Sequence, residues 1–570
     1  MIRRIVVPLA IAFVATLSAS APRPTRAVDF VAPTYYVGHA VNDYAVGSPC
    51  ASPDYWTDGD WTGGGAYDSD DDAIQDAVDN AASGSVIHIC AGAYVFENEV
   101  ALDEGESMTF EGDGINATNL DGDDTTRIFM GDDFNETDHG GILTLRDLSI
   151  FNAHAADELD NGGAVIADSL VVERVKIEES AGAYNGGALY AEANVTILDS
   201  QFSHNASSED GAVLYAWSPE ATINVVDSTF FDNEAGNMAG AIMAVGDMSI
   251  EGSEFEMNSS AGDGGAVLNT GDDSVVSIDS STFTENSAGG IAGAAMMQNL
   301  DSLTIEGTDF IENEAHEFGG AMNLYNDDNV VISNSNFVDN YAHGGEHFGN
   351  GNGGAIDACD IASFTSTDSI YESNHSTGYG GAIGLFGVTC NLPGSIVLER
   401  NAFIDNISQS DGGALWFAGT LERAIGNRFI GNTSGSNGGA IFGGWCTCDV
   451  PTTGVVRGNR FIRNHASIFG GAVWLPGDIR RLERNRFRGN TAGLGGGALA
   501  IDGVESNIWR IVRGNFIRRN VADWAGGGIY LSCSSLRRGV LNRLVAVNRM
   551  SANRADSDRR SKNVYQAGVC

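Results

Sequence analysis

One short pattern recurs along this 570-residue chain with an almost constant internal spacing. Each copy reads Phe-x-x-Asn, five further residues and then Gly-Gly-Ala. The Asn and the Ala are eight residues apart in ten copies, with Gly528 replacing the Ala in the last of them. The interval from Asn205 to Ala212 is one residue shorter, and the distance from an Ala to the next Phe ranges from 14 to 21 residues. A constant corner with variable loops is typical of stacked coils, so the sequence predicts a solenoid.

Apolar positions recur in columns around the motif, which predicts the side chains that face the interior. The residue after each Gly-Gly-Ala is aliphatic, as in Leu189 and Ile441, and so is the residue five positions before each Phe, as in Ile278 and Ile511. The Phe column comprises Phe202, Phe230, Phe255, Phe283, Phe310, Phe337, Phe403, Phe429, Phe461, Phe487 and Phe516, with Tyr371 in one coil. A period of two marks strands with one buried face. Three short strands in a coil of about 24–34 residues describe an all-β parallel β-helix.

The recurring Asn and Gly residues are expected at the corners of the coils. Gly has no Cβ and Asn tolerates the left-handed region, so both residue types suit turns that need a positive φ. About fourteen coils stacked at about 4.8 Å would give a rod about 65–70 Å long.

The paired motifs resemble the repeats of the chlamydial-type polymorphic outer-membrane proteins over about residues 160–530. In that family the repeats form a surface-exposed passenger β-helix, which is associated with adhesion and carried by a C-terminal autotransporter barrel. The segment Val86 to Val95 resembles the entry strand of right-handed β-helix proteins of the pectate-lyase-like superfamily, which implies a right-handed coil. About 40 residues follow Gly528, too few for a barrel of many ten-residue strands, so the family's own anchoring route is not expected here.

The N-terminal part is expected to differ from the repeats. Residues 1–27 read as a secretory signal, because two arginines precede an apolar run from Ile5 to Leu17 that is too short to span a bilayer. A retained N-terminal anchor is the alternative. We expect an exported protein, extracellular or at the cell surface in association with the outer membrane, with no transmembrane segment in the mature chain. Residues 28–83 form an irregular N-terminal cap region that ends in a predicted capping helix over Asp71 to Ala82.

The charge distribution divides the repeats into two arrays. Residues 1–400 carry 9 Lys and Arg against 65 Asp and Glu, whereas residues 401–570 carry 22 against 11. Two residues before the Phe, the first array has Ser or Thr and the second has Asn. We infer an acidic array over residues 156–395 and a basic array over residues 396–530, joined near residue 395. Coils without Gly-Gly-Ala occupy residues 84–155, and residues 531–570 are predicted to form a C-terminal cap.

Eight cysteines in an exported chain favour disulfides. Five of them lie in the variable loops, where a disulfide would hold an insertion down. A metal site at the two cysteines around Thr447 is the alternative for that pair, although no His lies near them in the sequence. The predicted pairs are Cys50–Cys90, Cys359–Cys390, Cys446–Cys448 and Cys533–Cys570.

An aromatic column is the first candidate binding site. The position after the inward aliphatic residue should point outward, and it holds Trp416, Phe442, Trp474 and Tyr530. Flat rings stacked along one side of a solenoid suit sugar rings or a protein partner. The alternative is that the long cysteine-containing loops fold over these rings and bury them.

An arginine column is the second candidate. Arg428, Arg460 and Arg486 directly precede the Phe, so they should project outward in register. Like charges this close repel one another unless an anionic group lies between them. Lipopolysaccharide phosphate, an acidic polysaccharide or the acidic array of another copy would supply such groups. The alternative is a solvated face that Glu483 partly neutralises. Nucleic acid would fit the charge, but an exported location argues against it.

Asp-rich loops are candidate Ca²⁺ sites, because carboxylate oxygens are the ligands that Ca²⁺ prefers. None of these loops has EF-hand or β-roll spacing, and solubility at high salt explains the same excess of acid. The loops are Asp68 to Asp72, Asp121 to Asp124, Asp132–Asp133, Asp272–Asp273 and Asp327–Asp328.

Catalysis must also be considered, because this fold hosts polysaccharide lyases and hydrolases. Hydrolysis needs paired carboxylates, and a lyase needs a base beside a neutralised charge. Gly-Asp-Asp runs begin at Gly122 and Gly271, but neither Gly-His-Gly nor Arg-Ile-Lys accompanies them. We therefore predict a protein that is not an enzyme and has no cofactor apart from a candidate Ca²⁺. It is expected to act in adhesion, binding a surface glycan, an anionic polysaccharide or a protein receptor. A polysaccharide-active β-helix enzyme is the alternative.

Overall fold

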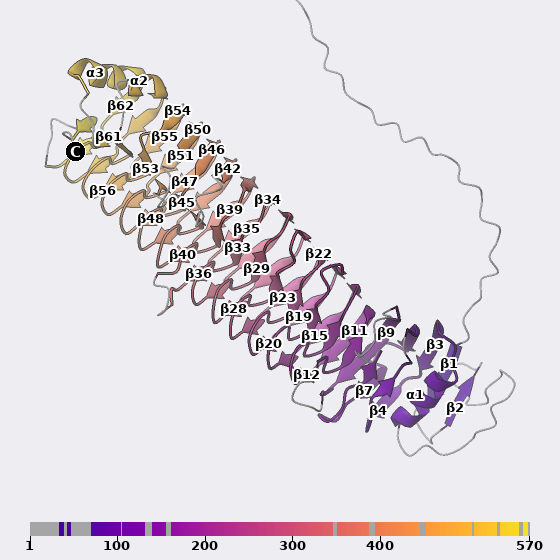
Figure 1. Cartoon of the computed structure of the whole chain (residues 1–570). Coiled ribbons are helices and arrows are strands. Elements are labelled where there is room, and N and C mark those ends of the chain that lie inside the picture. Colours follow the sequence, from indigo (N-terminus) through magenta and orange to yellow (C-terminus); the bar gives the residue numbers. More distant parts are fainter. Residues whose placement is uncertain are drawn as a thin grey trace, which may run out of the picture.

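Each copy of the repeat forms one coil of four short strands, and the coils stack into a long rod (Figure 1). A coil of the acidic array contains β26 (Val275–Asp279), β27 (Thr282–Thr284), β28 (Ser287–Ala288) and β29 (Ala295–Gln298). A coil of the basic array contains β50 (Thr452–Arg457), β51 (Arg460–Ile462), β52 (His465–Ala466) and β53 (Val473–Pro476). This computed structural model describes residues 34–38, 43–46, 70–103, 105–131, 140–155, 161–345, 350–386, 394–444, 452–503, 507–532, 536–557 and 562–567.

Three parallel sheets form the walls of the rod. Sheet A contains the first two strands of each coil, sheet C the third strand, and sheet B the strand after Gly-Gly-Ala. Equivalent residues of successive coils pair directly, as Ile278 does with Ile305. The predicted right-handed parallel β-helix is confirmed, with about 15 turns. The strands of sheet C were not predicted, because two residues are too few to produce a hydrophobic period.

The Phe column forms a continuous stack of rings inside the rod. From Phe202 to Phe487, successive ring centroids are 4.5–5.0 Å apart and the rings lie within 13° of parallel. Each such contact contributes about 0.5–1.5 kcal/mol beyond the burial of apolar area. These rings therefore make up much of the interior wall of sheet A.

Phe516 is the exception, and its predicted place in the column was wrong. Ile517 fills the inward position, and Phe516 is 43% exposed. Three residues separate Phe516 from Asn520, whereas two separate Phe and Asn in the other repeats. For the same reason, Val512 rather than Ile511 fills the aliphatic column. Counting three residues back from Asn520 gives Ile517, which is the residue that faces inward.

The Asn of each repeat lies inside the rod and does not adopt a positive φ, so this part of the corner prediction was wrong. The residue before it takes the positive φ, 54° at Glu285. The side-chain oxygen of Asn286 accepts hydrogen bonds from the backbone N and the Nδ2 of Asn258, at 3.0 Å each. Its Nδ2 donates to the Phe255 carbonyl and the Asn313 side-chain oxygen, at 2.9 and 3.0 Å. This asparagine ladder satisfies buried backbone groups at the corner.

The two glycines of Gly-Gly-Ala serve different purposes. The first adopts a positive φ as predicted, 68° at Gly264. The second allows close approach of two coils, because a Cβ on Gly265 would lie 1.9 Å from the carbonyl oxygen of Gly293. In the coil whose interval looks one residue shorter, Val213 takes the place of the Ala. The eight-residue interval from Asn205 is therefore kept in that coil too.

A second ladder, at the kink between the two strands of sheet A, differs between the arrays. In the acidic array, Ser281 Oγ accepts a hydrogen bond from Ser253 N at 3.1 Å and donates one to the Asp279 carbonyl at 2.8 Å. In the basic array, Asn459 Oδ1 accepts from both N and Nδ2 of Asn427, at 2.8 and 3.1 Å. Asn459 Nδ2 also donates to a carbonyl and to the next Asn. The basic array therefore has about twice as many side-chain hydrogen bonds at this kink.

The N-terminal end is closed by α1 (Asp70–Asp79), which begins one residue before the predicted capping helix of Asp71 to Ala82 and ends three residues before its predicted end (Figure 1). Its apolar face, which includes Ile74 and Val78, is buried, and the helix contacts the first strands of the rod. Sheet A also extends into the section expected to be irregular. There β1 (Thr34–Gly38) pairs in parallel with β3 (Ser85–Ile89) and antiparallel with β2 (Asp43–Val46).

The C-terminal segment contains two helices and one further coil. The helices are α2 (Ile508–Ile511) and α3 (Arg538–Val547), which contact each other beside sheet A. The further coil consists of β62 (Arg549–Ser551), β63 (Arg554–Ala555) and β64 (Val564–Gln566). It lies within residues 531–570, which were expected to form only a cap.

Several sequence predictions fall outside the described residues. They include the signal segment 1–27 and at least one cysteine of every predicted disulfide, so the disulfide pairs stay predictions. Of the two described cysteines, Cys90 is buried and Cys359 half-buried. No helix in the described part of the chain is long and apolar enough to cross a membrane.

Candidate functional site

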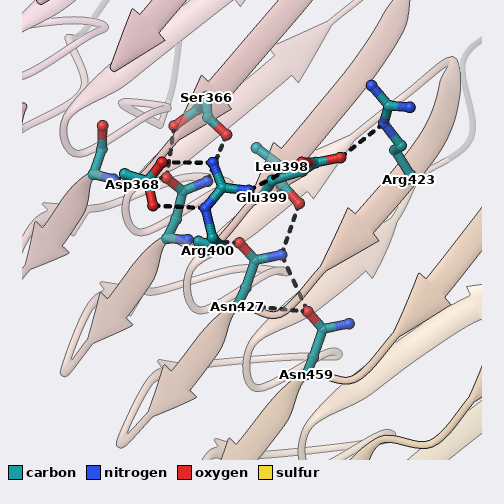
Figure 2. A network of polar contacts seen from close by, with 10 residues as sticks. Ser366, Asp368, Leu398, Glu399, Arg400, Arg423, Asn427 and Asn459 are labelled. Carbon is teal, nitrogen blue, oxygen red and sulfur yellow. Dashed lines mark hydrogen bonds and ion pairs between the residues drawn. The ribbon is translucent and has the colours of Figure 1, made fainter. Parts of the chain in front are cut away.

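The two arrays join at the coil of Tyr371, where a polar network passes through the wall of the rod (Figure 2). Ser369 N donates to Asn401 Oδ1 at 2.9 Å, so the last Ser of one ladder meets the first Asn of the other. Inside the rod, Ser366 stands in the aliphatic column and its hydroxyl lies 2.9 Å from the Tyr371 hydroxyl. The Ser therefore explains why Tyr replaces Phe in this coil, since each buried hydroxyl needs a partner.

The charged groups outside this network are paired with one another. Arg400 Nε and Nη2 donate to the two carboxylate oxygens of Asp368, at 2.7 and 2.6 Å. This contact holds the pKa of Asp368 below its usual range. Glu399 accepts from Arg423 at 3.0 Å. The two arginines and two carboxylates of this network are thus paired within the chain.

Beyond the joint, sheet A presents a surface that we call the basic face. Its members lie on the second strand of sheet A, or at the corner after it, in the coils from β47 (Arg428–Ile430) to β62. All of them are exposed. The basic face comprises Arg428, Arg460, Arg463, Arg486, Arg488, Phe516, Arg518, Arg519 and Arg549.

The predicted arginine column is part of this face. Arg428 is paired in register with Arg460, and Arg460 with Arg486, so their side chains follow one line along the rod. Among the described residues, none of the arginines of the basic face takes part in an ion pair. Glu483, which partly neutralises this face in the alternative interpretation, is buried and pairs with Arg513 at 3.1 Å. The structure thus assembles unneutralised positive charge at a spacing of about 4.8 Å.

Phe516 adds an aromatic surface to this line. It follows Arg486 in the same column and precedes Arg549. The guanidinium carbons of Arg486 and Arg549 lie 6.0 and 4.9 Å from the centre of its ring. The three residues line a shallow groove with Arg488, Arg518 and Ser551. Phe516 was expected inside the rod and was therefore missed as a site residue, although its longer distance to Asn520 was a signal of its exposure.

The predicted aromatic column is mostly covered. Trp416, Phe442 and Tyr530 are 6%, 8% and 7% exposed, and Trp474 is half-buried. Trp416 stacks on Phe386 at a ring distance of 4.2 Å. Trp416 and Phe442 form one packed cluster with Phe386 and Trp474, while the cysteine-containing loops of the alternative lie largely outside the described residues. We therefore place the candidate site on the basic face.

Two buried carboxyls in the acidic array were not singled out for this property by the sequence. Asp357 is 6% exposed and accepts one hydrogen bond from Asn323 Nδ2 at 3.2 Å, and its Oδ1 has no partner among the described residues. Burial raises the pKa of Asp357 to about 7. Asp327 is fully buried, accepts from Leu300 N at 2.9 Å, and burial raises its pKa to about 7 as well.

The Asp-rich loops do not converge on a common point. In the described part of the chain, no three His, Cys, Asp or Glu side chains are arranged to hold a metal ion. Asp70 to Asp72 form the first turn of α1, while Asp132–Asp133 lie outside the described residues. The described parts of these loops therefore do not form a cation site.

Comparisons with known proteins find the fold in polysaccharide lyases. No protein-family model matches the sequence, and no curated protein sequence matches it either. One similar solved structure is a mannuronic acid specific polysaccharide family 6 lyase from human gut microbiota, at 10% identity and a TM-score of 0.24. The likeness covers 85% of this chain and 89% of the lyase. Another is the family 6 alginate lyase AlyGC, at 9% identity and a TM-score of 0.18, over 87% of this chain and 98% of that one.

These neighbours contradict the prediction that the chain is not an enzyme, which was therefore wrong as stated. That prediction relied on missing motifs, and both neighbours are enzymes with a likeness to this rod. At these TM-scores the likeness carries neither an activity nor a site to this chain. The resemblance to polymorphic outer-membrane proteins stays a prediction, since no family model matches.

Proposed function

We propose that this protein binds an anionic polysaccharide along the basic face, at or outside the cell surface. The observation that carries the proposal is the line of exposed arginines without ion partners, Arg428, Arg460 and Arg486, which ends on Phe516. Attachment to polysaccharide-coated surfaces would follow from such binding.

The chemistry of the basic face suits a polymer that carries one carboxylate on each sugar ring. Guanidinium groups form bidentate hydrogen bonds with carboxylates, and a row of them meets successive sugars of one chain. A sugar ring also has an apolar side that can lie on the exposed ring of Phe516, between Arg486 and Arg549. A neutral polysaccharide would gain the contact with Phe516 alone, so we expect the protein to prefer anionic chains.

The direct test is calorimetric titration with polymannuronate, with neutral dextran as the comparison polymer. We expect binding to polymannuronate that weakens as salt is added, because screening acts on exposed charges. The variant Arg428→Gln/Arg460→Gln/Arg486→Gln should bind about tenfold or more weakly. Each exposed charge contact contributes up to about 1 kcal/mol, and 1.4 kcal/mol is a factor of ten.

Three arginines of the same array provide a matched control. Arg400, Arg423 and Arg513 are already paired with carboxylates, so Arg400→Gln/Arg423→Gln/Arg513→Gln removes the same charge from outside the basic face. Its affinity should stay within about twofold of the wild type, since screened long-range charge has little effect. Equal losses of affinity in the two variants would refute the basic face as the binding site. The same samples are assayed for unsaturated oligosaccharides, whose release would show that the bound chain is also cleaved.

A further inference from the structure

Two coils of this protein are charge-inverted copies of each other. Residues 306–313 read Glu-Gly-Thr-Asp-Phe-Ile-Glu-Asn, and residues 457–464 read Arg-Gly-Asn-Arg-Phe-Ile-Arg-Asn. Each carboxylate of the first segment is an arginine in the second, while the Gly, Phe, Ile and final Asn are unchanged. The three acidic residues are Glu306, Asp309 and Glu312, and the three basic residues are Arg457, Arg460 and Arg463.

These two coils lie equally far from the joint of the two arrays. The ladder of sheet A runs from β31 (Asp309–Ile311) through four coils to β51. The coils of Tyr371 and Phe403 are the middle pair of this series. Five of the six charged side chains are exposed, and Asp309 is half-buried. Among the described residues, none of the six forms an ion pair.

The neighbouring coils carry no further complete inversion, but they add one opposite-charge pair and no like-charge pair at the described positions of these strands. In the coils one step nearer the joint, Val338 corresponds to Ile430, and both are apolar. Two steps farther out, Glu256 corresponds to Arg518. The coils around Glu306, Asp309 and Glu312 have no Lys or Arg of their own, because none occurs between Lys176 and Arg400.

We propose that two copies of this chain pair face to face along sheet A, with the rods antiparallel. The two-fold axis lies between the coils of Tyr371 and Phe403 and runs parallel to the strands. Rotation about this axis reverses the order of the coils but keeps each residue's position within its strand. Arg460 of one copy therefore faces Asp309 of the other, and Ile462 faces Ile311. Each contact occurs twice, as in any two-fold interface between identical chains.

The dimensions of the face suit a stable interface. Twelve coils, from that of Phe230 to that of Met550, lie symmetrically about the axis. At about 4.8 Å for each step they span about 50–55 Å, and three strand residues with one corner residue are about 13 Å wide. The product is about 700 Å², close to the roughly 800 Å² that each partner buries in a standard interface.

The ionic strength determines whether the two copies associate. The whole chain has a net charge of −45, so two copies repel each other at long range. At about 0.1 M salt the Debye length is about 10 Å, which screens this repulsion but not contacts across the interface. At about 1 M salt the contacts are screened too, and the pair should separate.

Charge reversal and its complementation test the pairing. The variant Arg457→Glu/Arg460→Glu/Arg463→Glu makes both inverted coils acidic, and Glu306→Arg/Asp309→Arg/Glu312→Arg makes both of them basic. In sedimentation velocity at about 0.1 M salt, we expect a dimer for the wild type and monomers for each variant alone. An equimolar mixture of the two variants should restore a dimer with one copy of each. That restoration also shows that both variants are folded.

Three results would overturn the proposal: a monomeric wild type, a variant that still dimerises alone, or a mixture that stays monomeric. The proposal does not rest on polysaccharide binding, although both use the same arginines and should compete. The Glu306→Arg/Asp309→Arg/Glu312→Arg variant separates them, because it lacks the pairing and keeps the whole basic face. Loss of its dimer with retained binding of polymannuronate supports both proposals, and retained dimer with retained binding refutes only the pairing.

Discussion

The acidic and basic arrays have the same coil but opposite surfaces. Ile278 in the acidic array and Val456 in the basic array fill equivalent buried positions, and the stack of rings runs through the joint unbroken. The outward positions, by contrast, change from carboxylates such as Glu312 to arginines such as Arg463. The comparison shows that the interior columns specify the fold, while the residues between them are free to specify a ligand.

The arrays also differ in one interior feature, the ladder at the kink of sheet A. At this kink, Ser hydroxyls make the hydrogen bonds to backbone groups in the acidic array, and Asn side-chain amides make them in the basic array. An amide can donate and accept along the rod at once, whereas a hydroxyl has a single proton to donate. The basic array should therefore resist local opening more strongly than the acidic array.

The largest expected effect comes from removing one rung of each ladder. Asn459→Ala deprives Asn427 N and Nδ2 of their acceptor and the Ala424 carbonyl of its donor. We expect a loss of about 3–5 kcal/mol in the free energy of local opening, because each unsatisfied buried group costs about 1–3 kcal/mol. Hydrogen exchange of the neighbouring coils measures this free energy.

Ser281→Ala is the matched substitution in the acidic array. It removes one acceptor, for Ser253 N, and one donor, to the Asp279 carbonyl. The expected loss is about 1–2 kcal/mol. Equal losses at the two sites would show that the denser ladder gives no additional stability.

The second effect is a pH dependence confined to the acidic array. Burial raises the pKa of Asp357 to about 7, while an unfolded Asp ionises near 3.8. Between these values the unfolded chain releases a proton that the folded chain keeps, so stability falls as pH rises from about 4 to about 7. Asp357→Asn should remove the share of this slope that Asp357 contributes, leaving that of Asp327, and stabilise the surrounding coils by about 2–4 kcal/mol at pH 8.

Hydrogen exchange at pH 5 and pH 8, corrected for intrinsic rates, tests this dependence. The coils around Asp357 and Asp327 should open more readily at the higher pH, and the coils of the basic array should change little. A wild type whose acidic array is more protected at pH 8 would contradict the assignment of a neutral buried carboxyl.

A smaller effect is expected at the joint. Tyr371→Phe leaves the Ser366 hydroxyl without one of its partners and should cost about 1 kcal/mol. Adding Ser366→Val restores the apolar column of the other coils and should recover most of this loss, because both polar partners are then gone. Thermal unfolding of the two single variants and the double variant measures the coupling. Additive losses would show that the two hydroxyls do not act as a pair.

The smallest effects are expected for the outward positions themselves. Arg486→Gln and Glu254→Gln each remove one exposed charge from equivalent positions of the two arrays. Both should change the free energy of unfolding by less than about 0.5 kcal/mol, since exposed charges contribute little to stability. A loss of more than about 2 kcal/mol in the free energy of unfolding at either position would show that the outward residues also stabilise the fold.

Much of the fold could be predicted from the sequence because the repeat is long and its columns have a fixed period. The inward places of Ile278 and Phe283, and the positive φ of Gly264, follow directly from the motif. The interior place of Asn286 did not, because its role depends on the side chain of the next coil rather than on its own φ. The propensity of Asn for corners does not distinguish an Asn with a positive φ from an Asn whose side chain bonds the next coil.

The candidate site could be predicted only in part. The arginine column follows from the alternation of strand residues, so Arg428, Arg460 and Arg486 could be placed on the outside. The exposure of Phe516 was missed because one additional residue shifted its register. The sequence left open whether Trp416 is exposed or covered, because the alternation of a strand does not show what packs on its outer side, and in the structure Phe386 stacks on this ring.

The most direct test of this account asks where an anionic polysaccharide touches the rod. Phenylglyoxal labels accessible arginines, and peptide mass spectrometry reports each arginine separately, with and without saturating polymannuronate. The account predicts strong protection of Arg460 and Arg486, with little change at the carboxylate-paired Arg423 and Arg513. Unchanged labelling of Arg460 and Arg486 at saturation would contradict the claim that the basic face is the binding surface.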